Sequence, residues 1–470
     1  MPRFSGSWQQ FPLALGGCLC AGLFLRLFQI GNDAFWFDEI NVLQAVSRPN
    51  LWEAIRVTHE HVMAMPLHYA LVWLFGQVST SAGWMRLPEA IWGTAAIGVG
   101  YYVARYYLTP SQATLSAWIM ATSPLLVMYS QELRFYSGLL FFYLLVVFLG
   151  LKAIAENRGR DWLLFCTIGM VGLTFHVYVL LALGMVYAYL MADLRRNKER
   201  GALRSLVRST IFLLIAFLGL LVSFGRLSKD PHSLTREFGL IQSVLAGVGW
   251  AAPFPLPWQG WIYYFVIAAS ALLGLCSSRK AEEKKKQYLL LVIVAQICLI
   301  VVLNRATRYF ITPRQFIFLA PFLFFYSAIG IERLHRTWKS YSQQSKPYPS
   351  RVLQGVLIAI AAICAFPALM QYYRLEKGIV REALPVLRRE WKQGDLICVY
   401  PGLDAVTYAY YWREELGASI FPCNELEEKE KSKVRFLLAP PEWQPPSDFH
   451  LLFRPIRPTL HERWIWKRTS

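Results

Sequence analysis

The sequence predicts an all-α polytopic membrane bundle of about eleven transmembrane helices, followed by a small C-terminal α/β soluble domain. Three observations support this fold class. The 470-residue chain is 55% hydrophobic and only 17% charged, and both values depart from those of soluble proteins. Apolar runs of about 20 residues recur before residue 370. Beyond that residue the composition turns polar.

Each predicted span is about as long as a helix needs to cross a hydrocarbon core of about 30 Å. The first, Phe11–Ile30, lacks a small-residue cleavage site and is predicted to remain as a helix. Arg26, one turn from its end, is predicted to reach the membrane interface. Ten further spans are predicted near Leu87–Tyr107, Ala113–Tyr129, Phe135–Ala155, Trp162–Val179, Leu180–Leu194, Val207–Gly225, Trp261–Cys276, Tyr288–Leu303, Arg314–Ile331 and Val352–Met370.

Charge in the loops predicts the orientation of the bundle. The loops around residues 195–200, 279–286 and 332–351 are strongly basic, and the alternate loops are weakly basic. The positive-inside rule places the basic loops and the N-terminus in the cytoplasm, and the C-terminal domain in the periplasm or an equivalent exterior. The net charge of +18 is then chiefly a topology signal, and no nucleic-acid partner is predicted. We expect an integral protein of the bacterial inner membrane.

The membrane module is predicted to occupy residues 1–370, with residues 31–86 forming its first exterior loop. Within this loop Val62–Val78 is apolar and nearly long enough to span. A crossing there would turn every basic loop outward, and Pro66 interrupts the segment. We therefore predict a helix that lies in the interface or packs against the bundle.

Residues 371–470 are predicted to form the periplasmic α/β domain. Of the eight cysteines, Cys398 and Cys423 lie in this domain, and their spacing leaves open whether they are bridged. The others lie mostly in apolar runs as small buried side chains. The predicted elements are helix Glu376–Trp391, strand Asp395–Val399, helix Asp404–Trp412 and strands Val434–Leu438 and His450–Phe453.

Two adjacent carboxylates, Asp38 and Glu39, follow the first span in an aromatic setting. Adjacent residues point about 100° apart on a helix, so one can face a cavity while its neighbour caps the helix or pairs with a base. Desolvation by the neighbouring aromatic rings would raise the pKa of an inward carboxyl and suit it to accept a proton. The alternative is a solvated start of a helix.

Charged residues also mark two other exterior turns. Glu132 and Arg134 lie between the third and fourth spans, at the mouth of two hydrophobic helices. Charged groups there cost free energy, which indicates a functional role. An ordinary interfacial ion pair is the alternative. Arg305, Arg308 and Arg314 cluster before the tenth span. Arginine forks match phosphate oxygens, although lipid head groups would attract the same side chains.

Three histidines, His59, His61 and His68, flank the start of the interfacial segment. His59 and His61 have i, i+2 spacing, which suits a strand better than the helix expected here, and no cysteine or acidic triad completes a metal site. No metal and no cofactor are predicted, with a divalent metal as the alternative. A histidine that hydrogen-bonds or contacts phosphate is favoured.

In order and spacing, four motifs resemble those of the GT-C superfamily of integral-membrane glycosyltransferases, in the branch of dolichyl-phosphate-mannose protein mannosyltransferases and bacterial aminoarabinose transferases (glycosyltransferase family 39-like). They cover roughly the first 330 residues. The motifs are Phe37-Asp38-Glu39; Met65-Pro66-Leu67-His68-Tyr69 with Met85-Arg86-Leu87-Pro88; Tyr129-Ser130-Gln131-Glu132-Leu133-Arg134-Phe135-Tyr136; and Thr312-Pro313-Arg314. The segment Gln393-Gly394-Asp395-Leu396-Ile397 resembles the exterior domain of many bacterial members.

The resemblance implies transfer of a sugar from a polyprenyl-phosphate donor to an acceptor hydroxyl with inversion. It implies that Asp38 is the general base and Glu39 its structural or acceptor-orienting neighbour. Glu132 would order Arg134 or contact the sugar, and Arg134 would bind the donor phosphate. The other implied phosphate ligands are Arg308, Arg314 and His61, and the implied substrate ligands are Tyr136, Gln131 and His68.

This chain departs from the family pattern at Met65, where relatives carry a second proline, and at Gln315, where they carry tyrosine. These departures leave the acceptor class undefined among glycolipid, polysaccharide and protein. Two other functions compete with the enzyme. A lipid-linked-sugar transporter or flippase would also need polar sites in a bundle, but the inverted repeats typical of transporters are not visible in the sequence. A noncatalytic membrane scaffold would display the C-terminal domain.

Overall fold

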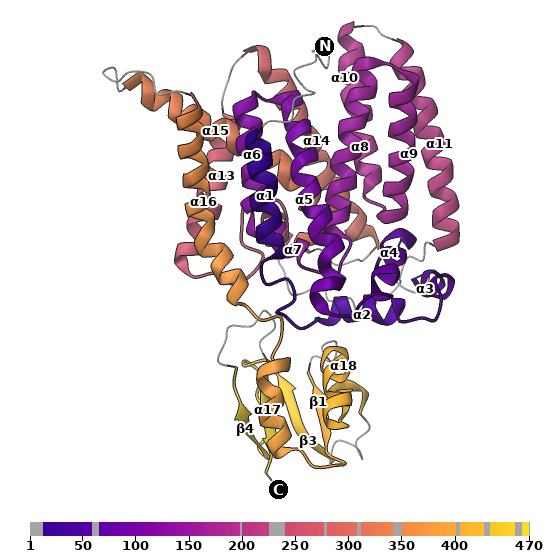
Figure 1. Cartoon of the computed structure of the whole chain (residues 1–470), viewed down its shortest axis with the longest axis vertical. Helices are drawn as coiled ribbons and strands as arrows, with labels where there is room; N and C mark the ends of the chain where they lie inside the picture. The colour runs from indigo at the N-terminus through magenta and orange to yellow at the C-terminus, as the bar shows by residue number, and fades with distance from the viewer. Residues whose placement is uncertain are drawn as a thin grey trace.

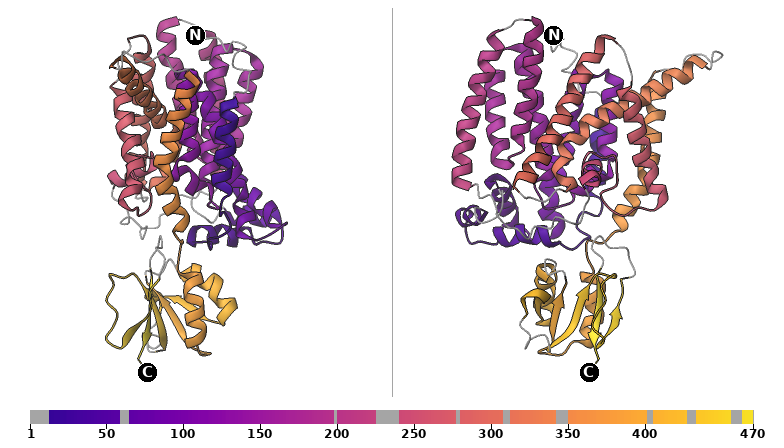
Figure 2. Two further views of the ribbon diagram at one scale, coloured as in Figure 1. Left: turned by 60° about the vertical axis from the view of Figure 1, so that its left-hand side comes forward. Right: turned by 180° about the vertical axis from the view of Figure 1, so that it is seen from behind.

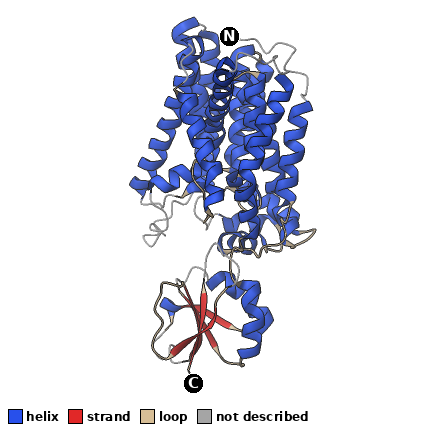
Figure 3. Cartoon of the chain, turned by 90° about the vertical axis from the view of Figure 1, so that its left-hand side faces the viewer, coloured by secondary structure: helices blue, strands red, loops and turns tan. Residues whose placement is uncertain are grey.

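The computed structural model describes residues 13–58, 65–197, 200–224, 240–276, 280–307, 312–341, 350–400, 405–426, 433–455 and 463–469. His61 and Arg308, both predicted phosphate ligands, lie outside the described residues. A helical bundle forms the larger part of the molecule, and a small domain containing a sheet follows it (Figure 3).

Long helices lie side by side in the bundle and enclose one large apolar core (Figure 1). The N-terminus lies at the end of the bundle opposite the C-terminal domain, and α16 leads down to that domain (Figures 1 and 2). The helices are α1 (Leu13–Leu27), α5 (Ala82–Tyr107), α6 (Pro110–Thr122), α7 (Pro124–Ser130), α8 (Tyr136–Glu156), α9 (Gly159–Phe175), α10 (Val179–Asn197), α11 (Arg200–Phe224), α13 (Trp258–Leu275), α14 (Lys280–Thr307), α15 (Ala320–Tyr341) and α16 (Ser350–Arg374), with the 3₁₀ helix η2 (Pro313–Leu319) before α15.

In the described residues every predicted span is largely helical, with Ala113–Tyr129 divided between α6 and α7 and Arg314–Ile331 between η2 and α15, but the predicted number of crossings is not confirmed. Among the described residues, three helical segments are long and apolar enough to cross a membrane: Tyr136–Glu156, Trp258–Leu275 and Pro313–Thr337. The pair α6 and α7, bent by 54°, makes a fourth if it counts as one span. The other helices of the bundle are interrupted by charges, are shorter, or extend beyond the described residues.

The bend between α6 and α7 explains the position of Arg26, which the sequence analysis placed wrongly at the membrane interface. Arg26 has no exposed surface. Pro124 opens α7 and has no N–H, so the carbonyl of Met120 loses its helical donor. Arg26 replaces that donor through Nη2 at 3.2 Å, while Nη1 bonds the carbonyl of Ala121 at 3.2 Å and Nε bonds Ser130 Oγ at 3.1 Å.

Three short helices, α2 (Phe37–Val46), α3 (Leu51–Thr58) and α4 (Pro66–Gly76), cover the end of the bundle that faces the C-terminal domain (Figure 1). A fourth, α12 (Leu240–Gly247), packs against η2. The apolar segment that the sequence placed at the interface forms α4. With 11 residues and a rise of about 1.5 Å per residue, α4 is too short to cross a bilayer.

The C-terminal domain is a mixed five-stranded sheet of order β2-β1-β3-β5-β4, with α17 (Val380–Glu390) and α18 (Ala405–Leu416) packed beside it. The strands are β1 (Leu396–Val399), β2 (Ser419–Pro422), β3 (Val434–Ala439), β4 (Phe449–Phe453) and β5 (Trp464–Arg468). The sequence analysis missed β2 and β5, which have only four and five residues. Cys398 and Cys423 form a disulfide with a Cα–Cα distance of 5.0 Å, which resolves the alternative that the sequence left open.

Candidate active site

The candidate site begins with a buried ion pair between α2 and α5. Glu39 has no exposed surface, and its Oε1 and Oε2 each lie 2.7 Å from a guanidinium nitrogen of Arg86. Oε1 also accepts the backbone N–H of Leu133 at 2.7 Å, and Oε2 accepts that of Trp36 at 3.3 Å. The second of these bonds caps α2, because the residue at the third helical position reaches back to the residue before the helix.

Arg86 also holds the chain segment that precedes α2. Nη1 donates to the carbonyls of Ile30 at 3.0 Å and Asp33 at 3.1 Å, and Nη2 donates to that of Ala34 at 3.1 Å. With the two bonds to Glu39, every N–H of the guanidinium has an acceptor. Burial opposes charge on Glu39, but Arg86 and then Lys377 hold its pKa below the usual value. Glu39 is therefore an ionised structural carboxylate.

Asp38, the neighbouring acid, points to different partners. Its side chain is 13% exposed, and its Oδ2 forms an ion pair with Nη1 of Arg314 at the start of η2. Nη1 of Arg134 lies 3.4 Å from the backbone carbonyl of Asp38. The two adjacent carboxylates thus divide in the way the helical geometry predicts: one is locked inside, and the other lies at the mouth of the bundle.

Two arginines flank the ring of Tyr136 beside Asp38. The guanidinium carbon of Arg314 lies 5.6 Å from the ring centroid, and that of Arg134 lies 5.9 Å from it. Arg134 also lies 4.9 Å from the ring of Phe135. Nε of Arg134 is buried and has no hydrogen-bond partner among the described residues. Arg134 therefore keeps a donor without a partner among the described residues, beside the place where Asp38 and Arg314 meet.

The position of Arg314 depends on Gln315. Oε1 of Gln315 accepts the side-chain amide of Asn304 at 2.8 Å and the backbone N–H of Thr312 at 3.3 Å. It therefore ties the start of η2 to the end of α14. The glutamine found where relatives carry tyrosine thus has a structural role in orienting the turn that carries Arg314.

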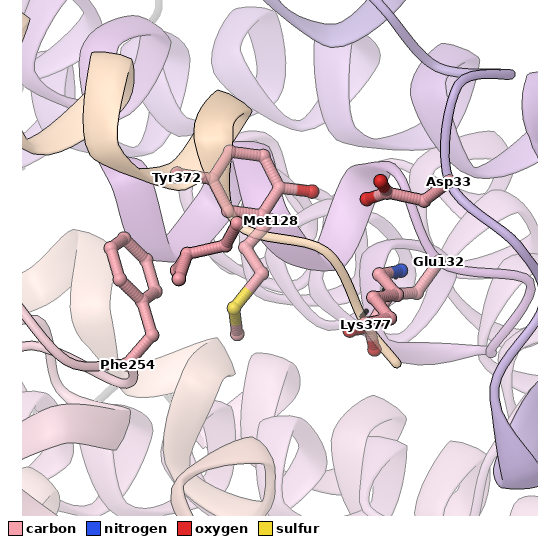
Figure 4. Close-up of a pocket in the computed structure, with 7 residues that line it drawn as sticks. Asp33, Met128, Glu132, Phe254, Tyr372 and Lys377 are labelled. Atoms are coloured by element: carbon pink, nitrogen blue, oxygen red, sulfur yellow. Dashed lines mark ion pairs between the residues drawn. The ribbon is translucent and has the colours of Figure 1, made fainter. Parts of the chain in front are cut away.

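Glu132 lies in a small pocket beside this cluster, with about 260 Å³ of empty space. Figure 4 shows Asp33, Glu132 and Lys377 at one side of it and Phe254 at the other, with Tyr372 and Met128 between them and the hydroxyl of Tyr372 pointing toward Asp33. Nζ of Lys377 lies 3.7 Å from Oε1 of Glu132, whose Oε2 has no partner among the described residues. Burial raises the pKa of Glu132 and outweighs the opposing effect of Lys377.

Gln131 and His68, both predicted substrate ligands, have protein partners in the structure. The amide nitrogen of Gln131 donates to the carbonyls of Leu25, Arg26 and Phe28 at the end of α1, at 3.3, 2.9 and 2.7 Å. His68 is 1% exposed, and its Nδ1 lies 3.3 Å from Oε1 of Glu89. Burial, followed by the charge of Arg134, lowers the pKa of His68 to about 3, so the imidazole is neutral.

The sequence analysis missed Arg86 and Lys377 as members of the site. Arg86 belongs to one of the family motifs, and that motif was the only signal that could have indicated a role. Lys377 lies in the link between α16 and α17, where the local sequence gives no reason to expect burial, yet it is only 7% exposed. Among the described residues no group of three or more histidine, cysteine or acidic side chains could hold a metal ion. The prediction that no metal is needed stays a prediction.

The chain is similar to known proteins in part of its sequence and in its fold. Residues 63–225 match the family model of the dolichyl-phosphate-mannose-protein mannosyltransferases. No curated protein sequence matches the chain. The structure of apo ArnT from Cupriavidus metallidurans is 12% identical with a TM-score of 0.56, and the alignment covers 96% of this chain and 97% of that one.

Two ligand-bound structures are also similar. ArnT from the same organism bound to undecaprenyl phosphate is 11% identical with a TM-score of 0.56 and 99% coverage of both chains. The archaeal oligosaccharyltransferase AglB from Archaeoglobus fulgidus, in complex with an inhibitory peptide and a dolichol-phosphate, is 13% identical with a TM-score of 0.53; 90% of this chain and 68% of that chain are covered. The predicted resemblance is confirmed in two respects: residues 63–225 match the mannosyltransferase family model, and the fold is shared with ArnT over nearly the whole chain.

Proposed function

We propose that this GT-C protein transfers a sugar from a polyprenyl-phosphate donor to an acceptor hydroxyl at the exterior face of the membrane, with inversion at the transferred carbon. One observation carries the proposal: a carboxylate, Asp38, and two arginines, Arg134 and Arg314, meet at one end of a membrane bundle. The undecaprenyl phosphate bound to ArnT and the dolichol-phosphate bound to AglB support the donor class.

The reaction needs a base and a cationic site on opposite sides of the sugar. Asp38 accepts the proton of the acceptor hydroxyl as the acceptor oxygen forms a bond to the anomeric carbon. The bond from that carbon to the phosphate oxygen breaks, and the electron pair leaves with the polyprenyl phosphate. Fixed guanidinium groups stabilise the charge that develops on the departing phosphate. Attack opposite to the leaving group inverts the configuration.

Arg314 pairs with Asp38, and in the proposed reaction the same guanidinium binds the donor phosphate. A donor phosphate competes with Asp38 for this guanidinium, and it also offers an acceptor to the unused Nε of Arg134. Binding of the donor thus loosens the pairing that masks the base. Asp38 then has an oxygen available for the acceptor hydroxyl, so the base becomes available once the donor phosphate has bound Arg314.

The same proposal gives the chain its place in the cell. The site and the C-terminal domain lie at one end of the bundle, and the N-terminus lies at the other (Figure 1). With the basic loops in the cytoplasm, the site faces the periplasm of a bacterial inner membrane. The acceptor is then a glycolipid, a polysaccharide or a protein of the cell envelope.

Replacement of Asp38 by asparagine tests the base. We expect Asp38→Asn to lower kcat for transfer from a polyprenyl-phosphate sugar by about 10²- to 10⁴-fold, while the protein still binds undecaprenyl phosphate. Asp395→Asn, on a turn of the C-terminal domain, is the control and should turn over normally. Unchanged turnover of Asp38→Asn would contradict the assignment. Translocation of the donor across vesicles with no glycosidic product would favour a transporter instead.

A further inference from the structure

The segment from residue 31 to residue 36, which leads directly into Asp38, is held from two sides. On the membrane side Arg86 bonds the carbonyls of Asp33 and Ala34. On the other side the C-terminal domain supplies the partners. Arg381 donates to the carbonyl of Asn32, and the hydroxyl of Tyr411 accepts the backbone N–H of Phe35 at 2.6 Å.

Packing joins the two parts of the molecule at the same place. Ala34 packs against the apolar core of the C-terminal domain. In return, Val406 and Tyr411 of α18 pack against the apolar cluster that holds Phe35 and Ile40 beside the bundle. α18 and α2 are in contact as elements. The segment before Asp38 is therefore part of the interface between the domain and the bundle.

Lys377, in the link to the C-terminal domain, also contacts the turn that carries Arg134. Its Nζ donates to the backbone carbonyl of Gln131 at 3.3 Å. The same atom lies 3.8 Å from Oε2 of Glu39 and 3.7 Å from Oε1 of Glu132. One buried ammonium thus contacts both α2 and the turn between α7 and α8.

We propose that the C-terminal domain positions the base for the transfer reaction, with Tyr411 and Lys377 as the positioning residues. The inference rests on the proposed function. Asp38 follows the held segment by two residues, so a shift of that segment moves its carboxylate relative to Arg134 and Arg314. Because effective attack requires the reacting groups in place to within about 1 Å, the loss of one support lowers the rate of the chemical step and leaves donor binding intact.

Tyr411→Phe tests the proposal because it removes only the oxygen that accepts the N–H of Phe35. We expect kcat to fall about tenfold with little change in KM for the donor. Tyr400→Phe is the matched control: Tyr400 belongs to the same domain, is 44% exposed, and should turn over as the wild type does. Lys377→Met should likewise lower kcat, and Lys377→Arg, which keeps the charge, should recover part of the loss.

Hydrogen exchange separates this inference from the proposed function. The backbone amides of residues 32–38 should exchange faster in Tyr411→Phe than in the wild type or in Tyr400→Phe, whether or not sugar is transferred. If exchange is faster but the chain transfers no sugar, the C-terminal domain does hold the segment before Asp38, and the proposed function is overturned. Unchanged exchange in Tyr411→Phe would overturn the proposal that the domain holds this segment. Faster exchange with unchanged kcat would show that the contact is structural only and would overturn the positioning role.

Discussion

Replacement of Glu39 by glutamine measures how strongly the site depends on its buried ion pair. The carboxylate accepts three hydrogen bonds of 2.7 Å, two from Arg86 and one from the backbone of Leu133. In Glu39→Gln one oxygen becomes an amide N–H that faces a guanidinium donor, and Arg86 keeps a buried charge without its full counterion. Breaking such a pair costs about 3–5 kcal/mol, a large part of the usual 5–15 kcal/mol of stability.

Thermal unfolding in detergent, followed by the fraction of protein that remains monodisperse, measures this loss. Glu53→Gln is the control, because Glu53 is exposed on α3 and its side chain accepts a hydrogen bond from the side-chain amide of Asn50 in its own turn. We expect the control to lie within about 0.5 kcal/mol of the wild type. Sugar transfer should be lost from Glu39→Gln, because Arg86 no longer fixes the segment before Asp38.

The dependence on pH has a definite sign. The pKa of Glu39 is held below its usual value, because Arg86 and Lys377 outweigh the effect of burial. The stabilisation is therefore present above the ordinary carboxyl pKa and is lost as the pH falls through the lowered one. The stability gap between wild type and Glu39→Gln should narrow in acid. A variant as stable as Glu53→Gln at neutral pH would refute the reasoning.

Three further predictions follow from the site and the domain. Arg134→Gln and Arg314→Gln should each weaken binding of undecaprenyl phosphate about tenfold or more in a titration, because a charge-assisted hydrogen bond contributes about 1.5–3 kcal/mol. Cys398→Ser should lower the free energy of unfolding of the C-terminal domain by about 2–4 kcal/mol, given a sequence separation of 25 residues to Cys423, and a reductant should destabilise only the wild type. Burial, and then Arg134, lowers the pKa of His68 to about 3, so the unfolded chain takes up a proton below about pH 6.5 that the folded chain refuses. Thermal unfolding should show that wild type loses more stability than His68→Gln as the pH falls from 6.5 toward 3.

The sequence predicted the parts of the site that depend on local pattern. The exterior turns, and the division between Asp38 and Glu39, follow from span lengths, loop charge and helical geometry. Arg26 shows where such reasoning stops. Its distance from the helix end indicated the interface, but the bend at Pro124 lies about a hundred residues away in the chain and creates the free carbonyls that Arg26 binds.

Lys377 is a second case, because its partners come from two separate segments, α2 and the turn between α7 and α8, which are both distant from it in the sequence. Strands β2 and β5 were missed for a related reason. Each is short, and pairing with neighbours distant in sequence decides that it is a strand. Local pattern thus predicted that the charged turns share one end of the bundle, whereas closure of the fold decides which cations complete the site.

The charges of the site separate into an inner and an outer set. In the inner set, the two cations Arg86 and Lys377 face the three acids Asp33, Glu39 and Glu132. Burial raises the pKa of Asp33 and that of Glu132, against the effect of Lys377 on both. Only Glu39, which holds the guanidinium fork, has a lowered pKa. In the inner set, burial therefore raises the pKa of two carboxyls, and the pKa of Glu39 is held low by Arg86 and Lys377.

The outer set has the opposite balance. Among the described residues, one carboxylate, Asp38, faces the guanidinium groups of Arg134 and Arg314 around the ring of Tyr136. A surplus of positive charge at a partly buried site attracts an anion, and phosphate oxygens match the geometry of the arginine forks. In the proposed reaction, a departing polyprenyl phosphate gains negative charge in the same step in which Asp38 gains a proton and loses its charge. Arg314, which the bound donor phosphate has already drawn away from Asp38, then stabilises the leaving group together with Arg134.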